Sequence, residues 1–222
     1  MKLNLKKRLK ENYGIISFVI GLLLFRTFAY DWSHIPSGSM EPTLYSGDRV
    51  LIDKMALGPT IPFTDIVLYQ KGNPERGDIV LFFPSHAEGI QYIKRVVGIP
   101  GDTIRVSGKN ILVNGKINAR QPYMISPKSD KITHERIQTG NISHVAQYST
   151  GGKLPNISSD IIVPEGQYFV MGDHRTHSLD SRYWGFVQRE QIVGKTSSLL
   201  LSFSDKRSFW DSVLKPFTVA SE

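Results

Sequence analysis

The first thirty residues pair a basic start with a long apolar run. Residues 13–25 (YGIISFVIGLLLF) are uncharged and mostly apolar, and the twelve residues before them carry five basic side chains and one acidic side chain. A helix needs about 20 apolar residues to cross a bilayer, and extension of the run to Tyr30 reaches that length. The pattern predicts one transmembrane helix over residues 13–30, with residues 1–12 in the cytoplasm and residues 31–222 outside it.

Two other interpretations of this run stay open. A basic start, a short apolar core and the sequence Thr27-Phe28-Ala29 loosely match a cleavable secretory signal peptide. Arg26 directly after the apolar core argues against cleavage, whereas in an anchor its long side chain can reach the headgroups. A buried core helix is disfavoured because the run is apolar on every face and lies beside the basic cluster.

Beyond residue 30 the pattern changes to short apolar or alternating runs between turn residues, with no comparable helical periodicity. Ser107–Asn110 and Asn114-Gly115 are typical of hairpin turns. The pattern predicts an all-β body built on an antiparallel sheet. The expected strands are β-branched or aromatic runs over residues 49–55, 66–69, 78–83, 91–98, 102–106, 111–113 and 167–171.

The segment from about residue 118 to residue 164 is polar and rich in Ser, Thr, Asn and Gly. Such composition is typical of connections that run over a protein surface. We expect an inserted β-ribbon or long loops that project from the core of the external body, which spans residues 31–222.

Charge and cysteine content narrow the possible partners. The formal net charge of the 222-residue chain is +7, and the first twelve residues supply +4 of it. A nucleic-acid binder spreads basic side chains over a groove or sheet face, whereas a basic cluster before an apolar run orients a membrane segment. We therefore expect a lipid bilayer and no nucleic acid as partner. The chain has no cysteine, which excludes disulfides and thiolate chemistry.

Ser39 lies in the segment Ile35–Leu44 (IPSGSMEPTL), which two prolines keep out of regular structure. A serine on such a rigid turn can be a nucleophile once a base takes its proton. Amides of the turn and the Ser37 hydroxyl could then form an oxyanion hole. Most loop serines instead make local turn or cap hydrogen bonds, so this segment alone is weak evidence.

Lys94 stands inside an apolar strand. Period-two alternation places it with Tyr92 and Val96 if Ile93 packs into the opposite face. Burial there would lower the pKa of the amine toward neutrality, as a general base requires. The alternative is a solvated lysine whose stem covers apolar neighbours. Arg95 faces the other way and is expected to be a structural ion-pair partner.

A polar cluster over residues 172–187 (GDHRTHSLDSRYWGFV) is too charged for a core strand. Ser178 could hydrogen-bond the lysine amine and orient it. We expect salt bridges that hold this loop, and the residues available for them are Asp173, Arg175, Asp180 and Arg182.

His174 and His177, together with Asp173, also suggest a metal site in the same cluster. Three neighbouring ligands without a supporting Glu or His elsewhere are too few for a structural or catalytic metal centre. We therefore expect no metal at these residues.

Together these stretches resemble the bacterial type I signal peptidases, also called leader peptidases. The resemblance covers most of residues 30–195, and four matching stretches in order make it specific. They are Pro36–Leu44, Arg76–Val80, Tyr92–Asp102 and Gly172–Phe186. The last stretch departs from the family pattern Gly-Asp-Asn-Arg-Asp-Asn-Ser-x-Asp-Ser-Arg at His174, Thr176 and His177. These departures bear on the loop salt bridges and on the pH response more than on the chemistry.

The resemblance implies a membrane-anchored serine endopeptidase of the bacterial cytoplasmic membrane. Such an enzyme removes signal peptides from exported preproteins near the translocon, without a metal or cofactor. In this chain Ser39 would be the nucleophile and Lys94 the general base. The Ser39 amide and the Ser37 hydroxyl would stabilise the oxyanion, and Ser178 would orient Lys94.

The family's substrate is expected to bind as an added β-strand. Its small side chains, at the first and third positions before the cut, would enter shallow apolar pockets. By motif match, the residues that line these pockets are Ile35, Pro36, Met40, Tyr92 and Ile93.

Two further hypotheses remain. A self-cleaving repressor with a Ser/Lys dyad would be cytoplasmic and would carry a DNA-binding helix-turn-helix, and neither property fits this N-terminus. A membrane-tethered binding module with a dead site is disfavoured because Ser39, Lys94 and Ser178 are all retained.

Overall fold

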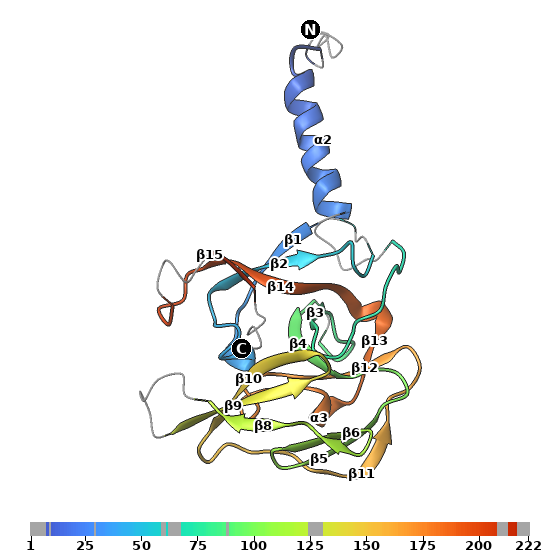
Figure 1. Ribbon diagram of the computed structural model, residues 1–222. Coiled ribbons are helices and arrows are strands. Elements are labelled where there is room, and N and C mark those ends of the chain that lie inside the picture. The colour runs from blue at the N-terminus through green and yellow to red at the C-terminus, as the bar shows by residue number, and fades with distance from the viewer. Residues whose placement is uncertain are drawn as a thin grey trace.

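The computed structural model describes residues 8, 10–28, 30–58, 61, 68–87, 89–123, 131–207 and 213–216. Helix α2 (Tyr13–Phe28) projects away from a body of strands (Figure 1). Within this described part of the chain, no helix combines the length and the hydropathy needed to cross a membrane.

The body is built mainly from antiparallel strands, which confirms the prediction that it is all-β. In the largest sheet, seven strands follow the order β1-β2-β14-β3-β4-β12-β13, and β15 pairs with β14. Their bounds are β1 (Tyr30–His34), β2 (Asp48–Asp53), β3 (Ile79–Phe82), β4 (Tyr92–Gly98), β12 (Gln167–Met171), β13 (Val187–Gln188), β14 (Ile192–Ser202) and β15 (Val213–Pro216).

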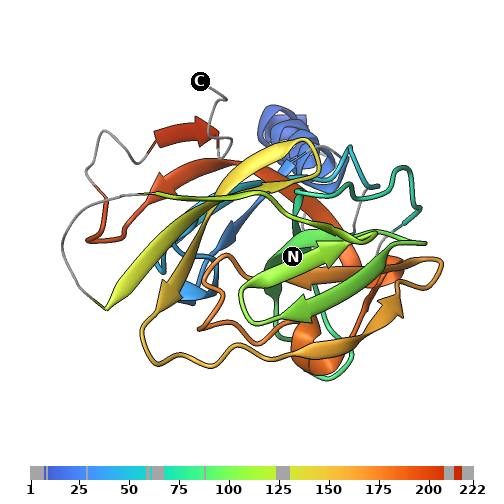
Figure 2. The ribbon, with the colours of Figure 1, turned by 60° about the horizontal axis from the view of Figure 1, so that its bottom comes forward.

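Two smaller sheets lie beside the large one (Figures 1 and 2). One has the order β10-β9-β8 and the other the order β11-β5-β6-β7. Their strands are β5 (Thr103–Ser107), β6 (Asn110–Val113), β7 (Lys116–Ile117), β8 (Arg120–Pro122), β9 (Ile132–Thr139), β10 (Ile142–Ser149) and β11 (Ile157–Ile162).

Three short helices complete the described elements. They are the 3-10 helices η1 (Gly38–Met40) and η2 (Arg189–Gln191), and the one-turn helix α3 (Ser181–Trp184).

The sequence locates the tight turns correctly. Asn114 and Gly115 connect β6 to β7 with φ of 53° and 73°, the left-handed conformation that an Asn-Gly hairpin turn requires. Gly108, with φ of 57°, turns the chain between β5 and β6. Local chemistry therefore determines the register of these hairpins.

One expected strand, over residues 66–69, is not observed where it can be checked. Residues 66 and 67 lie outside the described part of the chain, and Leu68 and Tyr69 belong to no strand. Both side chains are exposed. An apolar run alone does not make a strand when no neighbouring strand pairs with it.

The large sheet is buried on both faces around β3, whose four residues are all buried. Ile79 and Leu81 pack into one core cluster, and Val80 and Phe82 pack into another. The first cluster also contains Ile35, Met40, Leu44 and Ile93. It therefore joins the Ser39 segment to strand β4, which carries Lys94.

Candidate active site

Ser39 sits in η1 on a segment that the core holds at both ends. Ile35 donates its backbone N–H to the carbonyl of Asp48 at 2.8 Å, and the N–H of Gly47 donates to the carbonyl of Ile35 at 3.0 Å. Met40, directly after Ser39, has no exposed surface. The backbone that carries the Ser39 hydroxyl is therefore fixed on both sides.

Lys94 reaches this hydroxyl from β4. Its Nζ lies 2.7 Å from the Ser39 Oγ and donates to the carbonyl of Ile93 at 3.1 Å. The side chain is buried. Burial lowers the pKa of the amine to about 8, although the nearby Asp180 and Asp173 partly oppose this shift. A substantial fraction of this amine is therefore neutral near physiological pH.

The two other predicted catalytic hydroxyls differ in their contacts. The Ser37 Oγ lies 3.3 Å from the Ser39 Oγ. The Ser178 Oγ is buried and has no hydrogen-bond partner among the described residues, so the expected bond from Ser178 to Lys94 is not formed here. The Ser178 hydroxyl fits close to the dyad because residue 172 is a glycine. A side chain at this position would collide with the Ser178 hydroxyl and the Ser39 carbonyl.

Arg95 and Asp173 form a buried pair directly beside the dyad. The Arg95 Nε and Nη2 donate to the two carboxylate oxygens of Asp173 at 2.9 and 2.7 Å, and the Arg95 Nη1 donates to the carbonyl of Gly77 at 2.7 Å. The Thr43 hydroxyl donates to Asp173 at 2.5 Å. Although burial opposes it, the charge of Arg95 and these hydrogen bonds lower the pKa of Asp173 to about 2. Asp173 thus connects β4 to the nucleophile segment.

Asp180 and Arg182 brace the loop that carries Ser178. Arg182 donates from Nε and Nη2 to both oxygens of Asp180 at 2.8 Å, and its Nη2 also donates to the carbonyl of Arg175 at 2.7 Å. Asp180 accepts from the N–H of Gly172 at 3.0 Å. The Arg175 side chain, in contrast, lies 3.3 Å from the His144 Nε2 and forms no ion pair among the described residues. The expectation that Arg175 joins a salt bridge is wrong in this part of the chain.

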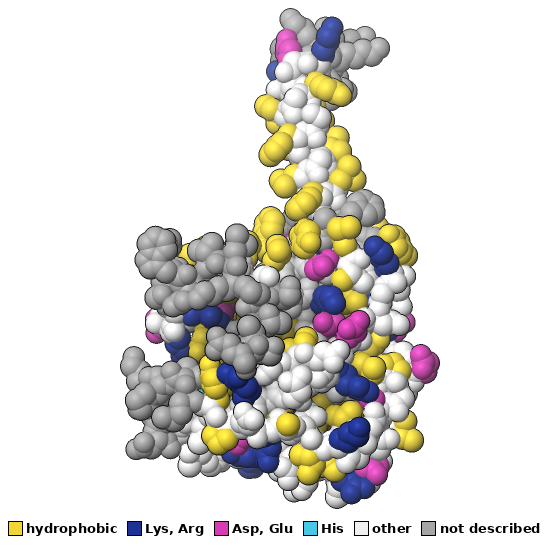
Figure 3. All heavy atoms as spheres, viewed as in Figure 1, with side chains coloured by type: hydrophobic (Ala, Val, Ile, Leu, Met, Phe, Trp, Pro, Cys, Tyr) yellow, Lys and Arg dark blue, Asp and Glu magenta, His cyan; other side chains and the backbone are white. Residues whose placement is uncertain are grey.

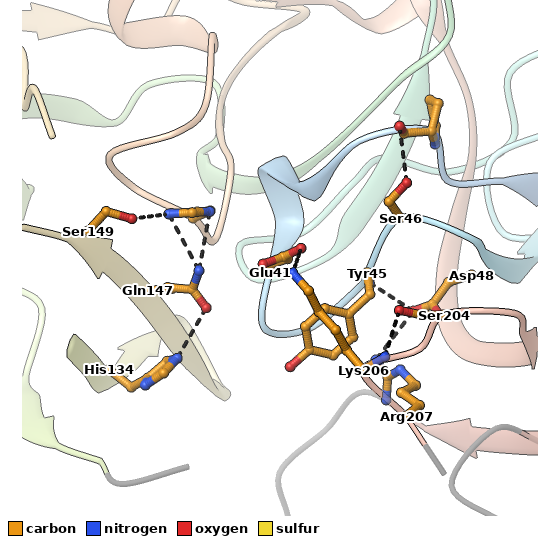
Figure 4. A network of polar contacts seen from close by, with 12 residues as sticks. Glu41, Tyr45, Ser46, Asp48, His134, Gln147, Ser149, Ser204, Lys206 and Arg207 are labelled. Carbon is orange, nitrogen blue, oxygen red and sulfur yellow. Dashed lines mark hydrogen bonds and ion pairs between the residues drawn. The ribbon is translucent and has the colours of Figure 1, made fainter. Parts of the chain in front are cut away.

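His174 joins the cluster of residues 172–187 to the β9–β10 hairpin. Its Nε2 lies 2.9 Å from the Ser149 Oγ, and Gln147 lies between His174 and His134 (Figure 4). Burial, and secondarily the neighbouring His177, lower the pKa of His174. Sequence reasoning missed Gln147 and Ser149, because their role depends on a long-range contact between the β9–β10 hairpin and His174.

The segment after β14 supports the nucleophile segment from another side (Figure 4). Lys206 pairs with Glu41 at 2.8 Å, and Arg207 donates to the carbonyl of Thr43 at 2.8 Å. Among the described residues no group of three or more His, Cys, Asp or Glu side chains could hold a metal ion.

A groove of about 280 Å³ opens beside the dyad. Of the five predicted pocket residues, Pro36, Tyr92 and Ile93 line it, whereas Ile35 and Met40 belong to the buried core cluster that also contains Ile93. Sequence reasoning missed three of the lining residues, Ile90, Gln91 and Leu179. The full lining is Pro36, Ser37, Ser39, Ile90, Gln91, Tyr92, Ile93, Lys94 and Leu179.

The chain is similar to known proteins over most of its length. The family model described as signal peptidase, peptidase S26, matches residues 9–201. Among curated relatives, the signal peptidase I of Pseudomonas aeruginosa is 36% identical over 220 residues, which cover 93% of this chain and 77% of the relative. The signal peptidase I of Rickettsia prowazekii is 32% identical over 229 residues, covering 95% of this chain and 86% of the relative. The chain belongs to the signal peptidase family, peptidase S26.

Proposed function

We propose that this chain is a membrane-anchored serine endopeptidase that removes N-terminal signal peptides from exported preproteins. The observation that carries the proposal is the 2.7 Å approach of the Lys94 Nζ to the Ser39 Oγ, in a site where burial lowers the pKa of the lysine to about 8. A serine becomes a competent nucleophile when a neighbouring base of matched pKa takes its proton. The match to relatives named signal peptidase I supports the substrate class.

In the proposed reaction Ser39 and Lys94 act together in successive steps. The neutral Lys94 amine takes the proton from Ser39 as the Ser39 oxygen attacks the carbonyl carbon of the scissile peptide bond. The resulting ammonium then gives that proton to the leaving amine, which departs as the new N-terminus of the mature protein and leaves an acyl-enzyme on Ser39. Water hydrolyses this ester with Lys94 again as the base.

Two donors near Ser39 suit the oxyanion of the tetrahedral intermediate. We assign this role to the Ser39 amide and the Ser37 hydroxyl, whose oxygen lies 3.3 Å from the nucleophile. Ser178 is a positioning residue in this proposal: its buried hydroxyl turns toward the Lys94 amine when substrate fills the groove. Catalytic hydrogen bonds are often longer without substrate than in the reacting complex.

The substrate enters as an extended strand beside β1. This strand is at one end of the large sheet and pairs only with β2 among the described residues, so its outer edge can accept another strand. The side chain just before the cut then lies in the groove that Pro36, Tyr92 and Ile93 help to line. The groove is mostly apolar, which suits an uncharged side chain.

We also propose that α2 anchors the enzyme in the bacterial cytoplasmic membrane near the translocon, with residues 1–12 inside and residues 31–222 outside. Hydrophobic side chains lie all along the visible face of α2 (Figure 3). Phe18 and Phe25 are 71% and 56% exposed. Exposed apolar side chains on every face of a helix suit a lipid environment. On this proposal the β8–β11 region, within residues 118–164, is an insertion in the external catalytic domain.

Cleavage of a preprotein by the full-length chain in detergent tests the proposal. Ser39→Ala and Lys94→Ala should each lower cleavage by at least about a hundredfold, while Ser107→Ala, at the exposed end of β5, should leave it unchanged. If the chain were a catalytically dead binding module, the preprotein would stay intact even with the unaltered chain. Persistent cleavage by Ser39→Ala would remove Ser39 from the role of nucleophile.

A further inference from the structure

A second, smaller hollow lies next to the groove on the same face of the large sheet. Its volume is about 50 Å³, against about 280 Å³ for the groove. Gln91 lines both, so the two spaces meet at this residue. The hollow is lined by Asp31, Trp32, Ser33, Ile52, Lys54, Leu81, Phe83, Gln91 and Val193.

Gln91 is held in place by a strand far from it in the sequence. The hydroxyl of Ser33, on β1, donates to the Gln91 Oε1 at 2.6 Å. Ser33 is only 7% exposed. In the strand order β1 and β4 are separated by three strands, so this bond joins the end strand β1 to the residue just before β4. The proposed substrate strand would run beside this bond.

The hollow is polar as well as small. Lys54, 4% exposed, pairs with Asp31 at 3.1 Å on its lining. A branched aliphatic group placed there would take the water away from this ion pair and from the Ser33–Gln91 bond without replacing any hydrogen bond. A small hydroxyl-bearing side chain can exchange hydrogen bonds with the same groups.

The position of the hollow matches a defined substrate residue. In an extended strand, alternate side chains share a face and lie roughly 6.6 Å apart. If Ser39 attacks the carbonyl of the last residue before the cut, that side chain occupies the groove. The side chain two residues upstream, the third before the cut, then reaches past Gln91 toward Ser33.

We propose that Gln91, positioned by Ser33, is a specificity-determining residue that makes this enzyme prefer serine or threonine over valine at the third position before the cut. The inference rests on the proposed function and deepens it. Thr and Val have nearly the same shape, so their discrimination reports the hydrogen bond and not the size of the hollow. A site that hydrogen-bonds a substrate hydroxyl rejects the analogue that lacks it more strongly than an apolar pocket rejects an added hydroxyl.

The experiment compares three peptides that differ only at this third position, with Ala, Thr or Val, as substrates of the full-length chain in detergent. We expect kcat/KM for Thr to exceed that for Val by about tenfold or more. Gln91→Met keeps the length of the side chain and removes its hydrogen-bonding atoms, so the ratio should fall toward one or invert. Gln121→Met, exposed on β8, is the matched control and should keep the original ratio.

Ser33→Ala provides a second measurement if Gln91→Met does not fold. It leaves Gln91 present but unheld, and it should lower the Thr-to-Val ratio at least threefold. A ratio at or below one in the unaltered enzyme, or an unchanged ratio in both variants, would overturn the role of Gln91 while leaving the proposed function intact. Failure to cleave even the Ala peptide would overturn the proposed function and this inference with it.

Discussion

The backbone N–H of His174 donates a hydrogen bond to the carbonyl of Ser39 at 3.1 Å. The cluster of residues 172–187 is therefore hydrogen-bonded to the nucleophile residue itself. The His174 ring in turn lies within hydrogen-bond distance of Ser149, in the β9–β10 hairpin. Two titratable groups of different kinds thus lie near Ser39: the Lys94 amine, at hydrogen-bond distance from its hydroxyl, and the His174 imidazole, on a loop that holds its backbone.

The first prediction concerns the pH dependence of kcat/KM. The working base is the neutral amine, so activity should rise with pH through the lowered pKa of Lys94, with a midpoint near pH 8. Below that midpoint it should fall about tenfold per pH unit, because an ammonium cannot accept the Ser39 proton. Initial rates of peptide cleavage between pH 6 and pH 10 measure this profile.

Protonation of His174 could produce a second acidic limb by disturbing the loop. Its pKa is lowered, with burial as the largest cause, so it should charge only in more acidic solution than an exposed histidine. The double variant His174→Asn, His177→Asn separates the two causes. We expect the limb near pH 8 to persist in this variant, and its disappearance would assign the pH dependence to the histidines.

The second prediction is that Lys94→Arg is nearly as damaging as Lys94→Ala, although charge and approximate length are kept. A guanidinium does not give up its proton at physiological pH and cannot act as a base. Both variants should lose roughly 10²–10⁴-fold in kcat. Cleavage by the arginine variant within tenfold of the unaltered enzyme would argue against Lys94 as the base.

The third prediction separates activity from stability at the same position. A lysine pKa of 10.5 in the unfolded chain and about 8 in the folded one costs the folded state roughly 3 kcal/mol at pH 7. The cost is fully present below pH 8 and disappears above pH 10.5. Between these two values the lysine is protonated in the unfolded chain but mostly neutral in the folded one. Lys94→Met should therefore be inactive and yet more stable than the unaltered enzyme at pH 7.

Denaturant unfolding at pH 7 and at pH 10 tests this point. The stability gained by Lys94→Met should be about 1–3 kcal/mol at pH 7, since loss of the Ser39 hydrogen bond offsets part of the gain, and should be clearly smaller at pH 10. An equal gain at both pH values would show that packing, and not the charge of the buried amine, is responsible.

Local patterns predicted much of the fold. Alternation and Asn-Gly chemistry sufficed for β4 and for the turn at Asn114, because these depend on neighbours in the chain. They were insufficient for Leu68 and Tyr69, since strand formation there needs a partner strand that sequence alone does not identify. Strand propensity is largely a measure of packing against such partners.

The candidate active site shows the same contrast between local patterns and long-range contacts. Ser39 and Lys94 could be chosen from their motifs, but their 2.7 Å approach depends on the core cluster that joins their segments. The bond from Ser33 to Gln91 joins residues 58 positions apart and belongs to no motif. Ser178 was chosen as a partner of Lys94, but among the described residues its buried hydroxyl has no hydrogen-bond partner, which a sequence pattern has no means to reveal.

The fourth prediction concerns membrane topology. If α2 is the anchor, protease added outside intact spheroplasts should digest the body and leave a small fragment that contains residues 1–12. This follows from the basic cluster at the start of the chain, which favours the cytoplasmic side. Complete protection of the body, or its release as a soluble protein that begins at Tyr30, would contradict the topology.

The fifth prediction compares two ion pairs that differ mainly in burial. Asp173 accepts two hydrogen bonds from Arg95, and both side chains are at most 2% exposed. Asp160 pairs with Arg105 at 2.8 Å, where the side chains are 52% and 45% exposed. Asp173→Asn leaves a buried guanidinium without its counter-charge and should cost about 3–5 kcal/mol of unfolding free energy. Asp160→Asn should cost about 0–1 kcal/mol, because solvent already screens that pair.

Activity should follow the same order, because Asp173 also holds Thr43 in the nucleophile segment, whereas Asp160 lies on β11. The stabilising effect of Asp173 exists above the ordinary pKa of an aspartate and is lost as pH falls through about 2, so the two variants should converge only in strong acid. Urea unfolding at pH 7 with parallel cleavage assays measures both quantities. Equal losses of stability in the two variants would mean that burial does not control the strength of these pairs, and that the Arg95–Asp173 pair is not what holds β4 against the Ser39 segment.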